Sequence, residues 1–468
     1  MTDHRKSYIV NFGLLLLLQL APVAVGRSPQ GQSFSAKPDQ PGNSCHEAPL
    51  VITRATLWTA EGLIENSEVV FASGRVAAVG KSGAVARPPG AQLIEASGDT
   101  LLPGLIDAHA HLVFPGGAPK EIRDDPRRPE FHITAKQLLR SGVTTARIHL
   151  WDLVNGPAFR RQAEDDCFPA PRLQIGGPGF IGGAPELARG IVWGVKDADD
   201  IRRKIEQTRS AGAQWIAIHD LHRFAAGQVD EIVGEARQAG LRVMAAGDDP
   251  ATIRQALEVG VDSIEYLDRT TAEPYPKELL ARMKERGATL FLVPPIGYYH
   301  RYLEFRRDAG SLDDPILTEF MPAALVAHLL NDLRSQRASP HPPSGERIER
   351  SFASLPVKFR QLYDAGLNVV IGTDCGSPAN FQADSIWWEL ENWRKLGVAP
   401  SEVIGAATTR GAALLRMPDV GALKVGARAD FVLYQGSVTG GKFDVRRVRH
   451  VAKGGALLLI VGVLYPVG

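Results

Sequence analysis

Short apolar runs alternate with amphipathic stretches over most of the chain. The apolar runs typical of buried strands are residues 101–106, 144–149, 172–175, 215–219, 242–246, 263–266, 289–293 and 367–373. Helical periodicity lies between them at residues 198–210, 227–239, 250–259, 277–286 and 352–365. Eight strand units alternating with helices predict a (β/α)8 TIM barrel, an α/β fold.

The two flanking regions have a different pattern, with strands and turns only. Such strands are predicted at residues 50–55, 67–71, 75–79 and 92–95, and again at 429–434 and 448–459. Neither region is large enough for a core of its own. We therefore expect residues 49–100 and 416–468 to form one small β-sandwich domain beside a barrel at 101–415.

One connection within the predicted barrel is unusually long, with an insertion around residues 295–350. Connections that follow a barrel strand emerge at the catalytic mouth, where long ones often form lids or specificity elements. A helical insertion without a role in the site is the alternative.

The first residues have the form of a secretory leader. Basic residues at 4–6 precede an apolar stretch at 12–25 and small residues at 24–26. This stretch is shorter than the roughly 20 residues of a membrane-spanning helix, so we predict a signal peptide at 1–26. A retained membrane anchor is the alternative. Residues 27–48 are typical of a linker, and the mature chain is expected to be exported, periplasmic or secreted, without membrane association.

The charge balance bears on possible binding partners, and the cysteine count on possible disulfides. The 53 basic and 52 acidic residues balance, which gives no reason to expect a nucleic acid partner. Three cysteines (Cys45, Cys167 and Cys375) allow at most one disulfide. The oligomeric state is left open, a homo-oligomer included.

The first barrel strand ends in a pair of histidines, in Pro103-Gly104-Leu105-Ile106-Asp107-Ala108-His109-Ala110-His111. Alternation along a strand sends residues i and i+2 to the same side. His109 and His111 therefore point together from the end of the strand, as two imidazoles that bind one metal ion would. A purely structural pair is the alternative.

The eighth strand ends in Asp374, within Gly372-Thr373-Asp374. Because the first and eighth strands are neighbours in a barrel, Asp374 is expected to face both histidines. A carboxylate in that place would bind the metal or accept a proton from attacking water. A solvated aspartate at a strand end is the alternative.

Several motifs together resemble the amidohydrolase superfamily, in its imidazolonepropionase-like and Xaa-Pro-dipeptidase-like branch. They are the histidine motif, Gly142-Val143-Thr144-Thr145, Gly260-Val261-Asp262-Ser263-Ile264-Glu265, Gly372-Thr373-Asp374, Ala406-Ala407-Thr408-Thr409 and Val425-Gly426-Ala427-Arg428-Ala429-Asp430. The resemblance covers roughly residues 50–459. It implies a barrel joined to a β-sandwich made from both chain ends.

The resemblance also implies metal ligands that this chain only partly has. Members of the branch usually hold two ions, with a carboxylated lysine on strand four and histidines on strands five and six. Here the lysine position is Ala217, no histidine occurs at residues 245–248, and the strand-six position is Tyr266. We therefore predict a reduced, mononuclear centre of His109, His111 and Asp374, with Zn²⁺ the most suitable divalent ion.

Further polar residues follow the vacated positions. His219, Asp248 and Asp268 each lie two residues beyond one of them, so they could rebuild a second site or, as isolated loop residues, have no role. His219 is the best candidate for an acid/base, and Tyr266 for a donor to a developing oxyanion, although Tyr266 could equally be a core residue. Candidate substrate contacts are Arg147, His149, Tyr298 and Tyr299.

These observations predict an exported, metal-dependent amidohydrolase that cleaves a carbon–nitrogen bond in a small amide or dipeptide-like substrate. A metal-dependent lyase or isomerase on the same scaffold is one alternative. A non-catalytic, ligand-binding relative is another, and it predicts no stoichiometric metal.

Overall fold

The computed structural model describes residues 48–464 with several short gaps. The gaps are Gly116, Ala118, residues 120–121, 123–124 and 126–127, Asp152, residues 185–190, Leu267, and residues 269–270, 339–344 and 461–462. The predicted leader at 1–26 lies outside the described residues, as does all but the last residue of the predicted linker at 27–48.

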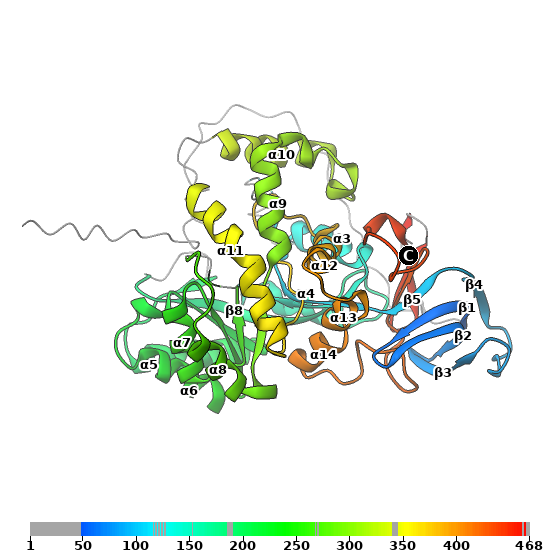
Figure 1. Cartoon of the computed structure of the whole chain (residues 1–468), viewed down its shortest axis with the longest axis horizontal. Helices are drawn as coiled ribbons and strands as arrows, with labels where there is room; N and C mark the ends of the chain where they lie inside the picture. The colour runs from blue at the N-terminus through cyan, green and yellow to red at the C-terminus, as the bar shows by residue number, and fades with distance from the viewer. Residues whose placement is uncertain are drawn as a thin grey trace, which may run out of the picture.

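A parallel barrel forms the centre of the molecule (Figure 1). Its strands are β6 (Leu105–Ala110), β7 (Val143–Ile148), β8 (Arg172–Ile181), β10 (Trp215–His219), β11 (Arg242–Ala246), β12 (Ser263–Glu265) and β13 (Phe291–Val293), with β9 (Val192–Trp193) beside β8. The eighth strand position closes the ring, because Val369 bridges Leu292 on β13 and Cys375 bridges Ala110 on β6. The predicted TIM barrel is confirmed.

Helices surround the barrel and cover its apolar outer face. They are α3 (Pro129–Arg140), α4 (Gly156–Ala163), α5 (Ala198–Ser210), α6 (Gln228–Gln238), α7 (Pro250–Val259), α8 (Lys277–Glu285), α12 (Ser385–Lys395), α13 (Pro400–Ala406) and α14 (Thr409–Leu415). Short 3-10 turns are η2 (Leu221–Arg223), η3 (Gly287–Thr289) and η6 (Val445–Arg447). The main apolar core lies between this helical layer and the strands.

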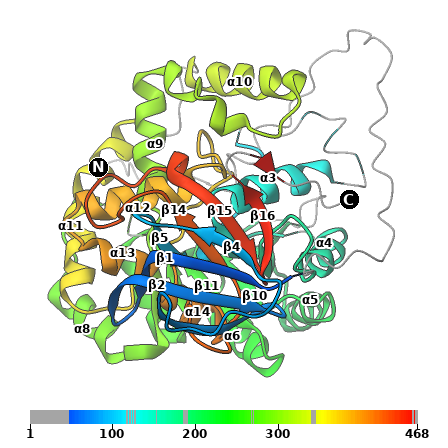
Figure 2. The same cartoon turned by 90° about the vertical axis from the view of Figure 1, so that its right-hand side faces the viewer.

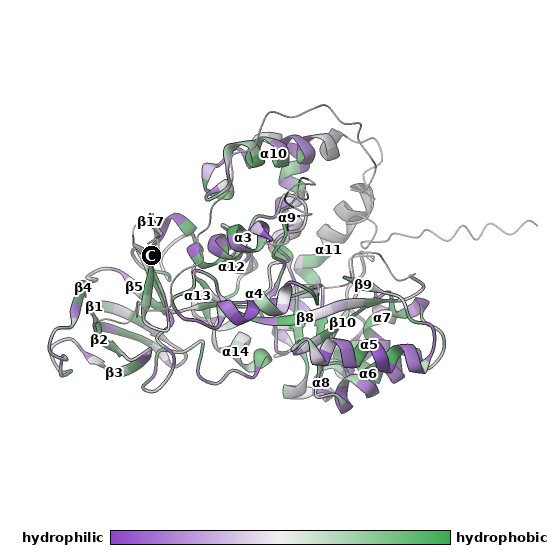
Figure 3. Cartoon of the chain, turned by 180° about the vertical axis from the view of Figure 1, so that it is seen from behind, coloured by the Kyte–Doolittle hydropathy of each residue, from purple (hydrophilic) through white to green (hydrophobic). Residues whose placement is uncertain are grey.

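Local sequence explains where these helices start and what they bury. In α5 the Asp197 carboxylate accepts a hydrogen bond from the backbone N–H of Asp200, which caps the first turn. Ile201 and Ile205, one turn apart, are buried, while the opposite side of the helix is charged. Both hydrophilic and hydrophobic positions are visible along α5 and α6 in Figure 3. Amphipathic helices of this kind fix the outer layer of the barrel.

The predicted long connection forms helices that rise over the barrel (Figure 1). They are α9 (Ile296–Arg307), α10 (Ala323–Ala338) and α11 (Gly345–Asp364), with the 3-10 turns η4 (Ala309–Leu312) and η5 (Pro315–Thr318). Leu325 and Leu329 of α10 pack with Phe114 from the loop after β6. Phe305 of α9 packs with Phe381 from the loop after the eighth strand position. The insertion is thus anchored to the two loops that follow the strands bearing His109 and Asp374.

Both chain ends join in one further sheet (Figure 2). Its strands are β1 (Leu50–Thr59), β2 (Gly62–Ala72), β3 (Arg75–Lys81), β4 (Gln92–Glu95) and β5 (Thr100–Pro103), followed by β14 (Phe431–Tyr434), β15 (Val448–Lys453), β16 (Ala456–Ile460) and β17 (Val463–Leu464). Antiparallel pairing of β14 with β5 connects the two ends. Phe71 on β2 and Phe431 on β14 stack with ring centroids 4.8 Å apart, although β5 and β1 lie between their strands. The sheet therefore folds over its own core.

A buried lysine ties this sheet to the barrel domain. Lys453 ends β15, and its Nζ donates to the backbone carbonyls of Ala163, Asp165, Phe168 and Ala170 at 2.8–3.2 Å. These carbonyls belong to the last residue of α4 and to the segment that follows it. None of the helices formed by the described residues is long and apolar enough to cross a membrane.

Candidate metal centre

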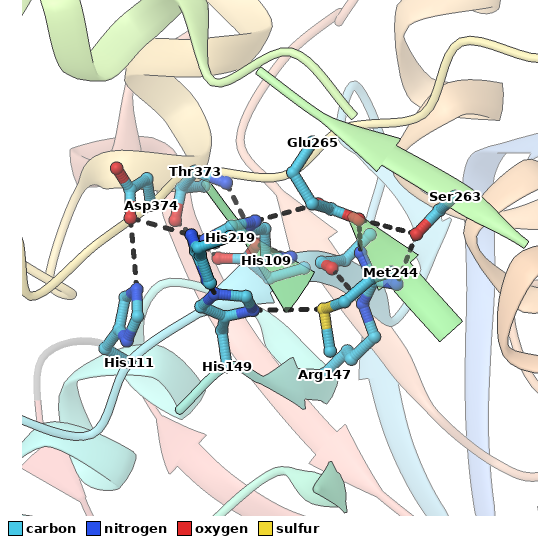
Figure 4. A network of polar contacts seen from close by, with 12 residues as sticks. His109, His111, Arg147, His149, His219, Met244, Ser263, Glu265, Thr373 and Asp374 are labelled. Atoms are coloured by element: carbon cyan, nitrogen blue, oxygen red, sulfur yellow. Dashed lines mark hydrogen bonds and ion pairs between the residues drawn. The ribbon is translucent and has the colours of Figure 1, made fainter. Parts of the chain in front are cut away.

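Three side chains meet at the end of the barrel where the strands terminate (Figure 4). The Nε2 atoms of His111 and His109 lie 3.1 Å and 3.4 Å from Oδ1 of Asp374. His109 and Asp374 are buried, and His111 is nearly so. All three ligand atoms lie within 4.8 Å of one another. The structure thus brings together the three residues that the sequence predicted as metal ligands.

Asp107 holds the two strand ends in register. Its Oδ1 accepts hydrogen bonds from the backbone N–H groups of His109 (3.1 Å) and Thr373 (3.0 Å). Its Oδ2 accepts one from the Thr373 hydroxyl at 2.6 Å. Burial raises the pKa of Asp107 to about 6, against the lowering effect of these hydrogen bonds. The carboxylate therefore joins the first strand to the segment that carries Asp374.

Gly372 and the backbone of Asp374 explain why the two strand ends approach so closely. A Cβ at Gly372 would lie 2.8 Å from Cβ of His109, closer than packed carbon atoms allow. Asp374 itself has φ +54°, a left-handed conformation that aspartate tolerates better than most residues. Its backbone N–H donates to the His109 carbonyl at 2.8 Å. These features turn the Asp374 carboxylate toward the histidines.

The polar atoms left over in this cluster fit a divalent metal ion. Nε2 of His109 and Oδ2 of Asp374 are buried without a hydrogen-bond partner among the described residues, whereas buried polar atoms are normally paired. Ligand atoms around a tetrahedral Zn²⁺, bound at 2.0–2.1 Å, lie about 3.3 Å apart. The separations of 3.1 Å and 3.4 Å between Oδ1 of Asp374 and the two imidazole nitrogens are close to that spacing, and all three ligand atoms lie within 4.8 Å of one another.

Glu265, at the end of β12, orients the first histidine. Its Oε2 lies 2.8 Å from Nδ1 of His109. A carboxylate accepts the Nδ1–H, which leaves the Nε2 lone pair directed at the metal position. Burial by itself would lower the pKa of His109, but the carboxylates of Asp374 and Glu265 outweigh it and raise the pKa to about 9. A metal ion that binds at Nε2 would therefore displace a proton from this nitrogen.

Arg147, a predicted substrate contact, lies inside the barrel instead of at its mouth. Its Nη2 is 2.7 Å from Oε1 of Glu265, and its other nitrogens donate to the Ser263 hydroxyl and the Ala108 carbonyl. The side chain is fully buried. Burial would raise the pKa of Glu265, but the Arg147 charge together with the contacts to His109 and Ser263 outweighs it and lowers this pKa. Arg147 thus keeps Glu265 ionised for its contact with His109.

Comparison with known proteins identifies the family. A model described as "Amidohydrolase family" matches residues 100–457. The chain belongs to the amidohydrolase family. It is therefore a hydrolase of carbon–nitrogen bonds from a metal-dependent family, and the branch inferred from the sequence motifs is confirmed by its relatives.

Those relatives align with most of the chain. The imidazolonepropionase of Anaeromyxobacter dehalogenans (strain 2CP-1) is 28% identical over 418 residues, covering 83% of this chain and 90% of the relative. The imidazolonepropionase of Salinispora arenicola (strain CNS-205) is 25% identical over 408 residues, covering 80% and 86%. The crystal structure of a Xaa-Pro dipeptidase with bound methionine superposes with a TM-score of 0.68 at 20% identity, covering 88% of this chain and 99% of that one.

The positions of this amidohydrolase that lack the expected ligands line one part of the barrel. Ala217 is buried in an apolar cluster with Trp215 and Met244. Tyr266, beyond β12, has φ +68°, unusual for a bulky residue, and its ring lies 5.4 Å from that of His109. Among the described residues, His109, His111 and Asp374 are the one group of three side chains that could hold a metal ion.

Two other candidates in this amidohydrolase lie outside that group. The carboxylate of Asp268 is buried against Lys358 of α11, whose Nζ lies 2.8 Å from Oδ2. Asp248 is half-buried in the loop after β11. Their predicted role as extra metal ligands remains a prediction, and for Asp268 it would require breaking a buried ion pair.

His149 and His219 form a second imidazole pair beside the three ligands. Their Nε2 atoms lie 2.9 Å apart, and the His149 ring stacks on that of His109 at a centroid distance of 4.5 Å. His149 is buried, so it does not lie at the open surface. The predicted acid/base, His219, is half-buried.

Tyr298 and Tyr299, predicted as substrate contacts, are both buried in α9. Their rings pack on each other with centroids 5.2 Å apart. Their role toward a substrate remains a prediction.

Sequence reasoning missed Glu265 and Met244 as parts of this network. Glu265 stands within the motif Gly260-Val261-Asp262-Ser263-Ile264-Glu265, and its place at a strand end was the signal that could have pointed to it. No local signal marks Met244.

Proposed function

We propose that this amidohydrolase cleaves a small amide or dipeptide-like substrate with one divalent metal ion, most suitably Zn²⁺, held by His109, His111 and Asp374. The observation that carries the proposal is the convergence of the three ligand atoms, with Oδ1 of Asp374 3.1 Å and 3.4 Å from the two imidazoles. Two imidazoles and a carboxylate are a usual ligand set for catalytic zinc, which keeps a position open for substrate.

The chain's own residues would move the protons of the reaction. When bound, the ion supplies Lewis acidity, which polarises the substrate carbonyl and acidifies water. Oδ2 of Asp374, buried and without a hydrogen-bond partner among the described residues, would accept the proton that the attacking water loses. His219 would give a proton to the leaving nitrogen as the carbon–nitrogen bond breaks. Glu265 keeps His109 oriented throughout.

The experiment is metal analysis of the purified mature protein by plasma mass spectrometry, beside the double variant His109→Ala/His111→Ala. We expect about one ion per chain, lost in the variant, together with hydrolysis of some members of a panel of amides and N-acyl amino acids. About two ions would overturn the mononuclear centre. No ion after zinc supplementation would overturn the metal mechanism. Turnover that yields no water-derived carboxylate would point to a lyase.

We also propose that the chain is exported. The leader pattern at residues 1–26 supports export, as does Cys167, which is disulfide-bonded, because disulfides persist in oxidising compartments. Cell fractionation and N-terminal sequencing test this. A mature chain that starts near residue 27 in the exported fraction is expected, and an uncleaved cytosolic chain would contradict it.

A further inference from the structure

His149 and His219 meet although a further strand, β8, lies between their own strands. His149 follows β7, His219 ends β10, and β8 runs between these strands. A Cβ at Gly176 of β8 would lie 3.0 Å from Cε of Met244, whereas one at Gly179 would lie 2.5 Å from Cδ2 of Leu150 and in ordinary contact, 3.5 Å, with Cδ2 of His219. Gly176 thus leaves space for Met244, which Figure 4 shows beside His149.

The contacts of His149 decide which of its nitrogens carries the proton. Nδ1 of His149 lies 3.0 Å from Sδ of Met244, and its Nε2 lies 2.9 Å from Nε2 of His219. A thioether sulfur accepts hydrogen bonds but cannot donate them. A bare Nδ1 would therefore put two lone pairs against each other, whereas an Nδ1–H makes a hydrogen bond to the sulfur.

The tautomer of His149 in turn sets that of His219. A neutral imidazole with Nδ1–H has a bare Nε2, which can only accept. The proton between the two Nε2 atoms must then belong to His219. His219 is left with Nδ1 as its basic nitrogen. His149 is buried, and its ring nitrogens face the Met244 sulfur and the His219 ring, surroundings that favour a neutral imidazole.

We propose that His149 is a positioning residue that, backed by Met244, fixes His219 as the Nε2–H tautomer. This inference rests on the proposed function, in which His219 is the proton donor to the leaving group. Protonated His219 carries a proton on each nitrogen, and the Nδ1–H is the one transferred to the leaving nitrogen as the carbon–nitrogen bond breaks. His219 returns to the neutral Nε2–H form that His149 accepts, so no tautomer exchange is needed between turnovers.

The first test reads the tautomers directly and does not depend on activity. ¹⁵N spectra of histidine-labelled, zinc-loaded full-length protein distinguish protonated from bare ring nitrogens, and His149→Gln and His219→Gln assign the signals. We expect His149 as the Nδ1–H form, which is diagnostic because free histidine favours Nε2–H, and His219 as the Nε2–H form. His149 with a proton on Nε2 would overturn the proposal, whether or not the protein hydrolyses amides.

The second test measures turnover in His149→Leu and His149→Gln. Leucine offers no acceptor, so we expect kcat to fall roughly 10- to 100-fold with KM within about twofold. The side-chain oxygen of the glutamine variant can accept from His219, and most of kcat should return. His132→Leu is the control, because His132 packs on Phe159 and Phe168 outside this network.

Metal content and thermal midpoint, measured on the same samples, separate this role from folding. Unchanged kcat in His149→Leu, or equal losses in the leucine and glutamine variants with metal retained, would overturn the positioning role. If the wild-type protein hydrolyses no amide, the proposed function fails, while the ¹⁵N result still decides the tautomer assignment.

Discussion

The two sides of the barrel mouth differ in the residues that line them. On one side, His109, His111 and Asp374 stand at the ends of the first and eighth strand positions. On the other, the family's remaining ligand positions carry Ala217 on β10 and Tyr266 after β12. The first side is polar, and its side chains are joined by hydrogen bonds and ion pairs. On the second side, Ala217 packs against Trp215 and Met244.

The difference indicates on which side of the site the residues serve function and not stability. A buried polar group without a partner costs roughly 1–3 kcal/mol, so a metal-binding nitrogen and a proton-accepting oxygen that are buried without partners are expensive to keep. The orphaned Nε2 of His109 and Oδ2 of Asp374 are such groups among the described residues, and Asp107, Glu265 and Arg147 keep them in place. On the opposite side, Ala217 in the place of the expected lysine carries no such cost, in keeping with the proposed single ion.

The largest expected effect comes from changing the carboxylate on the polar side. Asp374→Asn keeps the shape but removes the negative charge that faces both imidazoles. A metal-centred site supplies several kcal/mol of transition-state stabilisation, so we expect amide hydrolysis to fall roughly 10³-fold and bound metal to drop. Steady-state kinetics and metal analysis check this.

Asp262→Asn is the matched control, because Asp262 lies at the opposite end of β12. Its carboxylate accepts from the Val243 backbone N–H at 2.9 Å. Activity should survive this change. Equal activity in wild-type protein and Asp374→Asn would mean that the polar side is not the reaction centre.

A smaller effect is expected one step away from the metal, at Glu265. Glu265→Gln weakens the acceptor for His109 Nδ1–H. Mutation of a residue that hydrogen-bonds to a metal ligand typically lowers metal affinity 10- to 100-fold. It also leaves the Arg147 guanidinium buried without its counter-charge, which costs about 3–5 kcal/mol. Zinc titration and thermal unfolding measure the two consequences separately.

The double variant Glu265→Gln/Arg147→Met separates packing from metal orientation. Removing the unpaired charge should recover much of the stability, whereas the affinity for zinc should stay low. Recovery of both together would show that Glu265 acts through the fold alone and not through His109.

The local pattern of apolar and polar residues was sufficient to predict the helices and strands of the barrel. The predicted helices at 198–210 and 250–259 coincide with α5 and α7, which begin at aspartate caps and bury one apolar stripe. Seven barrel strands and the place of the eighth followed from apolar runs, although residues 367–373 form isolated bridges and not a continuous strand. The histidine pair followed from alternation within one strand. The facing of Asp374 toward the pair followed from the closure of a barrel.

Contacts between distant strands could not be predicted in the same way. Glu265 meets His109 across 156 sequence positions, and His149 meets His219 across 70 positions, from two strands that have β8 between them. Arg147 was expected to meet a substrate because a strand-end arginine has no local sign of its partner. Its burial against Glu265 depends on which strands lie opposite each other, and only the three-dimensional structure gives that information.

The smallest effect is expected on the apolar side, where Ala217→Ser adds a single hydroxyl. Ala217 is fully buried, so an unpaired hydroxyl there should cost about 1 kcal/mol of stability. Metal content should be unchanged and activity should stay within about threefold.

Ala236→Ser on α6, equally buried but away from the mouth, controls for the cost of the hydroxyl. If Ala217→Ser alone altered the metal content, the apolar side would lie within reach of the ion, and the contrast between the two sides would no longer hold. If both variants lose only stability, the ion depends on the polar side alone, as a centre of His109, His111 and Asp374 requires.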